Sequence, residues 1–165
     1  MKNVTPLVLA ATLTLSSFSA DRTIDNLRPA EVTARGIVSA LRQSSEAKFV
    51  ALFPTLAEFH RQMDNNESFY GLNLDAAKKD FAKTYSMELL PAVRRAYATL
   101  VDEAEKRNID WSDVTVVSVE LPEATTGFST MKITFGQDGK KFDLLIERSL
   151  MIDGKWKVSQ YVKFI

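Results

Sequence analysis

Hydrophobic residues recur at every third or fourth position through the earlier part of the chain, a spacing typical of amphipathic helices. Three helices are predicted from this spacing, over residues 29–43, 46–52 and 56–64. Residues 21–28 are polar and are expected to form a loose lead-in, with Pro29 in the first helical turn, where its missing N–H is not needed. The third helix has the clearest start signal, a capping box formed by Thr55 and Glu58.

A longer helical pattern covers residues 74–107. Pro91 lies inside it and cannot donate the backbone hydrogen bond of an inner helical residue, so a kink or a break is expected near Leu89. Asn108 is the expected end of this helix.

From Asp113 onward the hydrophobic pattern alternates from one residue to the next, which is typical of strands. Four strands are predicted, over residues 113–121, 128–136, 140–151 and 155–164. The predicted fold class is therefore α+β. Its N-terminal helices are expected to pack on one face of a four-stranded antiparallel meander sheet, in a cone-like arrangement.

The register of the first long hairpin follows from which residues must share a face. The apolar positions are odd-numbered before the turn and even-numbered after it, so a loop with an even number of residues is needed. A two-residue Asp138-Gly139 turn meets this condition and pairs Phe135 with Phe142.

The same reasoning predicts an odd loop for the last hairpin, because the apolar positions are even-numbered on both sides. The segment 152–154, with Gly154 in the left-handed position of a bulge, supplies three residues. This register pairs Leu150 with Trp156 on the inner face. It also pairs Asp143 with Lys163 on the outer face.

The long helix that leads into the sheet, and the closing pattern Leu150-Met151-Ile152-Asp153-Gly154-Lys155-Trp156-Lys157-Val158, resemble the cystatin-like, or nuclear-transport-factor-2-like, superfamily. The resemblance covers residues 74–165. It implies a curved sheet with a pocket between its concave face and the helices. Enzymes of that superfamily commonly carry an Asp–His pair in the cone, and no such pair maps onto this chain. The superfamily includes enzymes and ligand binders, so the resemblance does not name a function.

The first residues read as an export signal. Lys2 is followed by no charge until Asp21, and an apolar stretch over residues 4–15 precedes a run of small residues. Residues 1–20 are therefore predicted to be a signal peptide, cleaved after Ser19 or Ala20, and residues 21–165 to be a single α+β domain. A retained membrane anchor is the rival interpretation, but threonines and serines make the stretch weakly apolar.

The amino-acid composition excludes several kinds of site and partner. The chain has no cysteine, which excludes a lipoprotein-type anchor, disulfides, zinc–thiolate sites and a cysteine nucleophile. With 21 basic and 21 acidic residues it lacks the concentrated positive charge that nucleic-acid binding requires. The expected product is a soluble periplasmic or secreted domain with no stable membrane anchor after cleavage, and neither nucleic acid nor a cofactor is an expected partner.

His60 is the one histidine, and Asp64 follows it by one helical turn. A hydrolytic triad also needs a nucleophile, and no serine lies in a recognisable elbow. A histidine at the solvent edge of an amphipathic helix is the preferred interpretation. One histidine without cysteine or a spaced acidic cluster predicts no metal site, and an enzyme is the less favoured class.

Under the predicted register, Arg148, Gln160 and Ser129 converge on the inner face of the sheet. A buried guanidinium needs a carboxylate or another anion as its partner. Arg148 is therefore a candidate donor to a ligand carboxylate or phosphate. The alternatives are an internal ion pair with an acidic helix residue, or a part of the sheet that is uncovered and wet.

Three aromatic residues in predicted linkers are candidates for the rim of a pocket: Phe69, Tyr70 and Trp111. The leading hypothesis is an exported, non-enzymatic domain that binds a small molecule or peptide between sheet and helices, with a small anionic ligand as one expected partner. The alternative is an envelope protein-interaction or inhibitor-like module that uses a sheet face or an edge strand.

Overall fold

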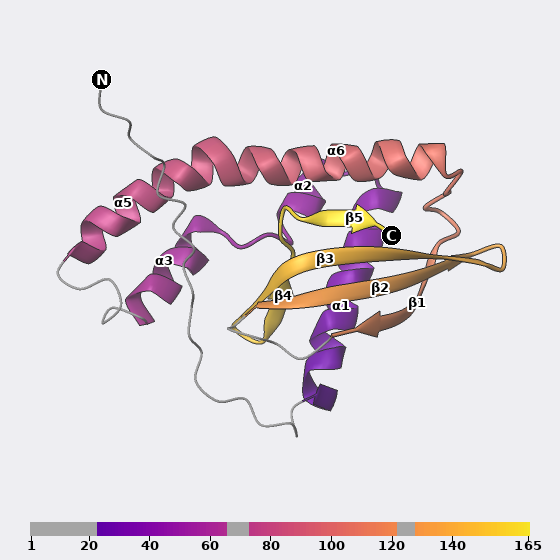
Figure 1. The fold of residues 1–165 in the computed structure, drawn as a ribbon, viewed down its shortest axis with the longest axis horizontal. Coiled ribbons are helices and arrows are strands. Elements are labelled where there is room, and N and C mark those ends of the chain that lie inside the picture. Colours follow the sequence, from indigo (N-terminus) through magenta and orange to yellow (C-terminus); the bar gives the residue numbers. More distant parts are fainter. Residues whose placement is uncertain (1–22, 66–72, 122–127) are drawn as a thin grey trace.

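The computed structural model describes residues 23–65, 73–121 and 128–165 (Figure 1). Helices come first and an antiparallel sheet follows, which confirms the predicted α+β class. The helical elements are α1 (Thr23–Arg42), α2 (Glu46–Val50), α3 (Leu56–Asn65), α5 (Leu74–Thr84), the π-helical segment η3 (Tyr85–Leu89) and α6 (Leu90–Lys106). The strands are β1 (Thr115–Glu120), β2 (Phe128–Gln137), β3 (Lys140–Ile152), β4 (Lys155–Lys157) and β5 (Val162–Phe164).

The first helix begins earlier than predicted. α1 starts at Thr23 and continues through Pro29, so the expected loose lead-in is helical from that residue onward. A proline removes one backbone hydrogen bond from a helix interior. α1 continues on both sides of that missing bond, with helical residues before and after Pro29.

The predicted capping box is present at the start of α3. The Thr55 backbone N–H donates to Glu58 Oε2 at 2.7 Å, and the Glu58 N–H donates to Thr55 Oγ1 at 3.2 Å. These two bonds satisfy N–H groups that the first turn of a helix leaves without partners.

The long helical pattern is interrupted where Pro91 predicted a kink. α5 and α6 are joined by η3, in which the Leu90 N–H donates to the Tyr85 carbonyl five residues earlier. A π-helical turn widens the helix locally and is a known way to accommodate an irregularity. Asn108 ends α6 as predicted, in the left-handed conformation with φ 55°.

The strands follow the order β1-β2-β3-β4, and β5 pairs with β3 farther along the same edge. The predicted register of the β2–β3 hairpin is confirmed, because Phe135 pairs with Phe142. Asp138 and Gly139 both have positive φ, 51° and 76°, as a two-residue type I′ turn requires.

The predicted fourth strand is wrong in two respects. It is divided into β4 and β5, and its first hairpin has a two-residue Asp153-Gly154 turn in place of the predicted three-residue loop. Trp156 therefore pairs with Met151, and Lys163 pairs with Leu145.

A β-bulge in β3 explains this difference. Met131 pairs with Ile146, whereas Ser129 pairs with Ser149, so one residue of β2 faces two residues of β3. The extra residue changes which positions face inward. The positions of β3 that share the face of Met131 and Ile133 are even-numbered before the bulge and odd-numbered after it, and the even loop places Trp156 on that same face. Leu150 and Ile152 lie on the opposite face and are buried as well.

The helices cover one face of the curled sheet. In Figure 1, α1 crosses behind the strands, and α6 runs along the top beside β5; α1 contacts β1 and β4. Thr33 Oγ1 donates to the Trp156 carbonyl at 2.7 Å and ties α1 to β4. Apolar side chains fill the layer between sheet and helices, including Ile37, Phe49, Val93, Leu100, Met131, Ile133, Phe135, Leu144, Ile146, Trp156 and Val158.

Within residues 23–65, 73–121 and 128–165, no helix combines the length and the apolar character needed to cross a membrane.

Candidate functional site

Arg148 lies at the bulge of β3, and its side chain is exposed. The predicted inward orientation is therefore wrong. The bulge turns Arg148 away from the core, and its backbone has a left-handed φ of 57°. Its guanidinium carbon lies 5.3 Å from the ring centroid of Tyr161, a residue that is 45% exposed.

The break between β4 and β5 brings Tyr161 beside the bulge. The Glu147 N–H donates to the Tyr161 carbonyl at 2.9 Å, and the buried Ser159 hydroxyl donates to the Glu147 carbonyl. The Tyr161 N–H in turn donates to Ser159 Oγ at 3.0 Å. The Ser159 side chain thus makes hydrogen bonds that a strand backbone would otherwise make, and these bonds fix the backbone of Tyr161.

A distant loop completes this break. The Val158 N–H donates to the carbonyl of Leu52, after α2, at 3.0 Å. Because Val158 hydrogen bonds to that loop, the chain leaves the β3 ladder between Lys157 and Val162. The Arg148–Tyr161 pair is therefore positioned by a bulge in one strand and an interruption in its neighbour.

Ser129 and Gln160, the other two residues of the predicted site, do not come together with Arg148 on the inner face. Ser129 is buried and pairs with Ser149, not with Arg148. Gln160 is half-buried and lies in the break between β4 and β5. The predicted convergence assumed unbroken alternation along β3, which the bulge removes.

Trp111, predicted as a rim residue, lines a surface hollow where the ends of α1 and α6 meet the 109–112 segment. Its ring packs edge-on against Phe135, with the ring centroids 5.8 Å apart. Phe69 and Tyr70 lie outside the described residues.

His60 packs against α5. Its Nε2 atom is 3.2 Å from the Lys78 carbonyl, and the Asp64 carboxylate forms an ion pair with the Lys78 ammonium group. In this arrangement Asp64 is engaged by Lys78, and both contacts tie α3 to α5.

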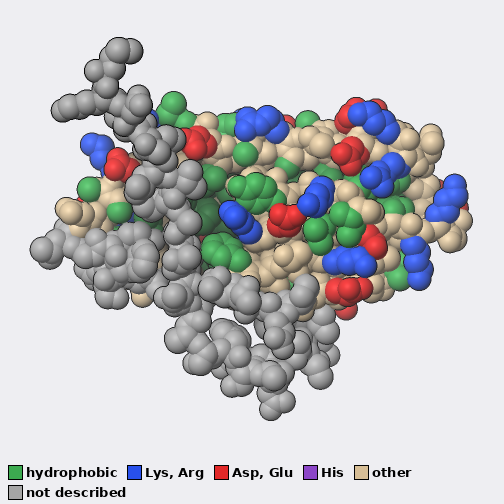
Figure 2. All heavy atoms as spheres, viewed as in Figure 1, with side chains coloured by type: hydrophobic (Ala, Val, Ile, Leu, Met, Phe, Trp, Pro, Cys, Tyr) green, Lys and Arg blue, Asp and Glu red, His purple; other side chains and the backbone are tan. Residues whose placement is uncertain are grey.

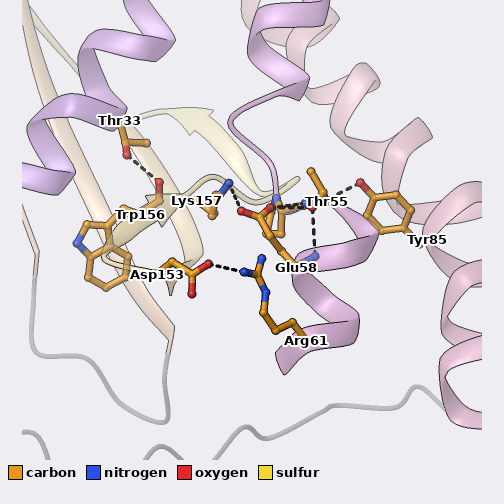
Figure 3. Close-up of polar contacts among 9 residues, drawn as sticks. Thr33, Thr55, Glu58, Arg61, Tyr85, Asp153, Trp156 and Lys157 are labelled. Atoms are coloured by element: carbon orange, nitrogen blue, oxygen red, sulfur yellow. Dashed lines mark hydrogen bonds and ion pairs between the residues drawn. The ribbon is translucent and has the colours of Figure 1, made fainter. Parts of the chain in front are cut away.

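A polar cluster joins α3 to β4 (Figure 3). Lys157 Nζ is 2.7 Å from Glu58 Oε1, and these side chains are only 12% and 17% exposed. Burial alone would raise the pKa of Glu58, but the hydrogen bonds from Lys157 and Thr55 lower the pKa below its ordinary value. Arg61 Nη1 lies 3.2 Å from Asp153 Oδ2, so a second ion pair, also drawn in Figure 3, links α3 to the β3–β4 turn.

The outer sheet face carries charges of both signs. Lys132 Nζ lies 3.2 Å from Asp143, and Lys163 Nζ lies 2.6 Å from Glu147. A hydrogen bond from Thr134, opposed by partial burial and assisted by Lys132, lowers the pKa of Asp143. Figure 2 shows basic and acidic side chains interspersed over the face it views, without a large field of one sign.

Tyr161 and Ser159 were missed by the sequence reasoning. Alternation along residues 155–164 already places Tyr161 opposite the apolar positions, and that signal marks an outward aromatic residue. No local pattern marks Ser159, because its role depends on the Glu147 carbonyl of another strand.

Comparisons of the chain with protein-family models, with curated proteins and with solved structures found no match.

Proposed function

We propose that the chain is an exported, non-enzymatic binding domain that recognises a carboxylate or phosphate group of a partner protein through Arg148. The observation that carries this proposal is the exposed Arg148 guanidinium, held over Tyr161 by a left-handed bulge residue. The export part of the proposal rests on the pattern of residues 1–20.

The backbone conformation supports a role for this side chain. A left-handed conformation costs an ordinary L-residue about 1–2 kcal/mol, and glycine avoids most of that cost. Bulges commonly redirect a side chain near a functional site. At φ 57°, Arg148 has a conformation for which glycine is better suited, and the bulge turns its guanidinium to the surface.

The chemistry of the pair supports an anionic group on the partner. A guanidinium above an aromatic ring keeps the N–H groups at its edge available for a bidentate bond to a carboxylate or phosphate. Arginine and tyrosine are also enriched among the residues that dominate binding energy at protein interfaces. Tyr161 thus serves as a platform that limits the motion of Arg148.

Two features favour the outer surface over the other locations considered. The layer between sheet and helices is packed with buried apolar side chains, which favours binding outside it. The free side of the edge strand β1 is a weaker candidate because β1 has a bulge between Val116 and Ser118, and bulges discourage strand addition.

The proposal can be tested by NMR titration of the ¹⁵N-labelled protein with a short glutamate-rich peptide, a lysine-rich peptide of equal length and inorganic phosphate. We expect the acidic peptide to shift the Arg148 side-chain N–H and the Tyr161 amide resonances. R148G should reduce its affinity at least about tenfold. Because glycine suits φ 57°, this variant should fold at least as stably as the parent chain.

K155Q is the matched control, since it removes one exposed positive charge close to the same strands. It should leave acidic-peptide binding nearly unchanged. Equal losses in K155Q and R148G would show only general charge attraction. That result, or equal shifts with the lysine-rich peptide, would overturn the proposal. Shifts with phosphate but not with the acidic peptide would replace the partner protein by a small phosphate ligand.

A further inference from the structure

The surface hollow at Trp111 is separate in its residues from the Arg148 site. Its volume is about 480 Å³, and it is open to solvent. Small-molecule sites commonly have volumes of about 300–1,000 Å³ and combine apolar walls with a few polar groups. Leu41, Ile109 and Trp111 supply apolar surface here, and Arg42 and Asp110 supply charge.

Two helix ends meet at this hollow. Ser44 and Asn108, which follow α1 and α6, both line it, and both have left-handed φ values, 47° and 55°. The Ser45 N–H donates to the Ala40 carbonyl at 2.8 Å, and the Ile109 N–H donates to the Ala104 carbonyl at 2.9 Å. These bonds close both helices with the Schellman pattern. The C-terminal end of a helix carries partial negative charge and favours a positively charged group.

Arg42 is held on one side of the hollow. Its Nε and Nη2 atoms donate to the carbonyls of Trp111 and Val114 at 3.1 and 3.0 Å. These bonds tie the 111–114 segment to α1 and fix the position of the guanidinium group. The remaining edge of an arginine so held has the geometry to bind a carboxylate.

Asp110 is held independently. Its Oδ1 atom accepts a hydrogen bond from the Ser112 N–H at 2.9 Å, and its own backbone N–H donates to Gln137 Oε1 at 2.9 Å. Hydrogen bonds from Ser112 lower the pKa of Asp110, so its carboxylate is charged at neutral pH. Among the described residues, Arg42 and Asp110 form no ion pair with each other, although both line the same hollow.

We propose that this hollow binds a small zwitterion of the class of free α-amino acids. The ligand carboxylate lies against Arg42, and its ammonium group lies against Asp110 and the two helix ends. Its side chain packs on the apolar wall that includes Trp111. A simple anion would meet the Asp110 carboxylate, and a simple cation would meet the Arg42 guanidinium, whereas a zwitterion satisfies both.

The test is an NMR titration with L-leucine, N-acetyl-L-leucine and L-leucinamide as probes, with L-lysine and L-phenylalanine extending the side-chain range. Trp111 is the reporter because it lines the hollow. Its indole N–H is buried and has no hydrogen-bond partner in the described part of the chain. W156F assigns the resonance, since the chain has two tryptophans. We expect L-leucine to shift the Trp111 indole and the Ser112 amide, and each blocked analogue to bind at least about tenfold more weakly.

D110N sharpens the test, because its amide oxygen can still accept the Ser112 bond while the charge is lost. It should weaken binding of L-leucine at least about tenfold, and D113N, an exposed carboxylate three residues on, should not. Equal binding of N-acetyl-L-leucine would make the hollow an anion site, and equal binding of L-leucinamide a cation site. Either result, or no shift with any of the amino acids, overturns the proposal.

Discussion

Glu58 connects the start of α3 to β4 through one side chain. Its carboxylate accepts from the Thr55 backbone N–H at the start of α3 and lies 2.7 Å from the ammonium group of Lys157 on β4. Both charged side chains are largely buried, so removing one leaves the other without its partner in a poorly solvated place.

We expect E58Q to lower the free energy of unfolding by about 1–2 kcal/mol at neutral pH. The folded-state pKa of Glu58 is lowered, so its stabilising contribution is present above its unfolded pKa of about 4.3 and is lost as the pH falls through the folded value. The difference between wild type and E58Q should therefore shrink below about pH 4. Urea unfolding at several pH values measures this difference.

E105Q, at an exposed position of α6, is the control and should change stability by less than about 0.5 kcal/mol. A difference for E58Q that stays the same down to about pH 3 would show that the lost charge is not its cause.

At the scale of elements, the two Asp-Gly turns set the β2–β3 and β3–β4 hairpins of the sheet. Asp138-Gly139 and Asp153-Gly154 both have positive φ at each turn residue. That conformation matches the natural twist of the paired strands and favours glycine at the second position. The turns therefore specify local pairing, which the sequence predicted for the first hairpin and missed by one residue for the second.

We expect G139A to lower the free energy of unfolding by about 1–2 kcal/mol, because alanine must adopt φ 76°. Apart from the neighbouring residues of the turn, an added Cβ meets no atom within 4 Å, so the cost comes from the backbone conformation. Chemical denaturation measures it. K140A, the next residue and also exposed, should change stability by less than about 0.5 kcal/mol; a G139A effect no larger than this would argue against the strained turn.

The second hairpin shows why element prediction failed where it did. Odd and even positions lie on opposite faces only along an uninterrupted strand. The bulge at Arg148 breaks that condition inside β3, and a polar residue there gives no local warning. The same bulge moved Arg148 from the predicted inner face to the surface.

At the scale of the whole molecule, mass spectrometry can test whether the predicted export signal is cleaved. Expression of all 165 residues in a bacterial host with an export pathway should yield a periplasmic or secreted product shortened by residues 1–19 or 1–20. The product should carry no lipid, because the chain has no cysteine.

L9R places a charge in the apolar stretch and should block export, leaving the full-length mass in the cell. Recovery of the uncleaved wild-type chain from the membrane fraction would support the rival anchor and contradict the signal peptide.

The candidate sites were predicted in part: single residues could be recognised from the sequence, but their neighbours in space could not. Arg148 and Trp111 were both named from the sequence, because an arginine among apolar positions and an aromatic residue in a linker stand out locally. Their surroundings could not be predicted. Tyr161 reaches Arg148 through a break between strands, and Arg42 reaches Trp111 from a helix 69 residues earlier.

Residues close together in the chain specify the α+β class, the capping box at Thr55, the Asp138-Gly139 hairpin and the apolar face that β2 and β3 share before the bulge, so these features could be predicted from the sequence. The divided fourth strand and the orientation of Arg148 follow from contacts between residues far apart in the chain. Those depend on the Leu52 carbonyl, which takes the Val158 N–H, and on Ser159, which bonds to Glu147. Hydrogen bonds between residues far apart in the chain do not alter the hydrophobic periodicity, so the sequence pattern does not reveal them.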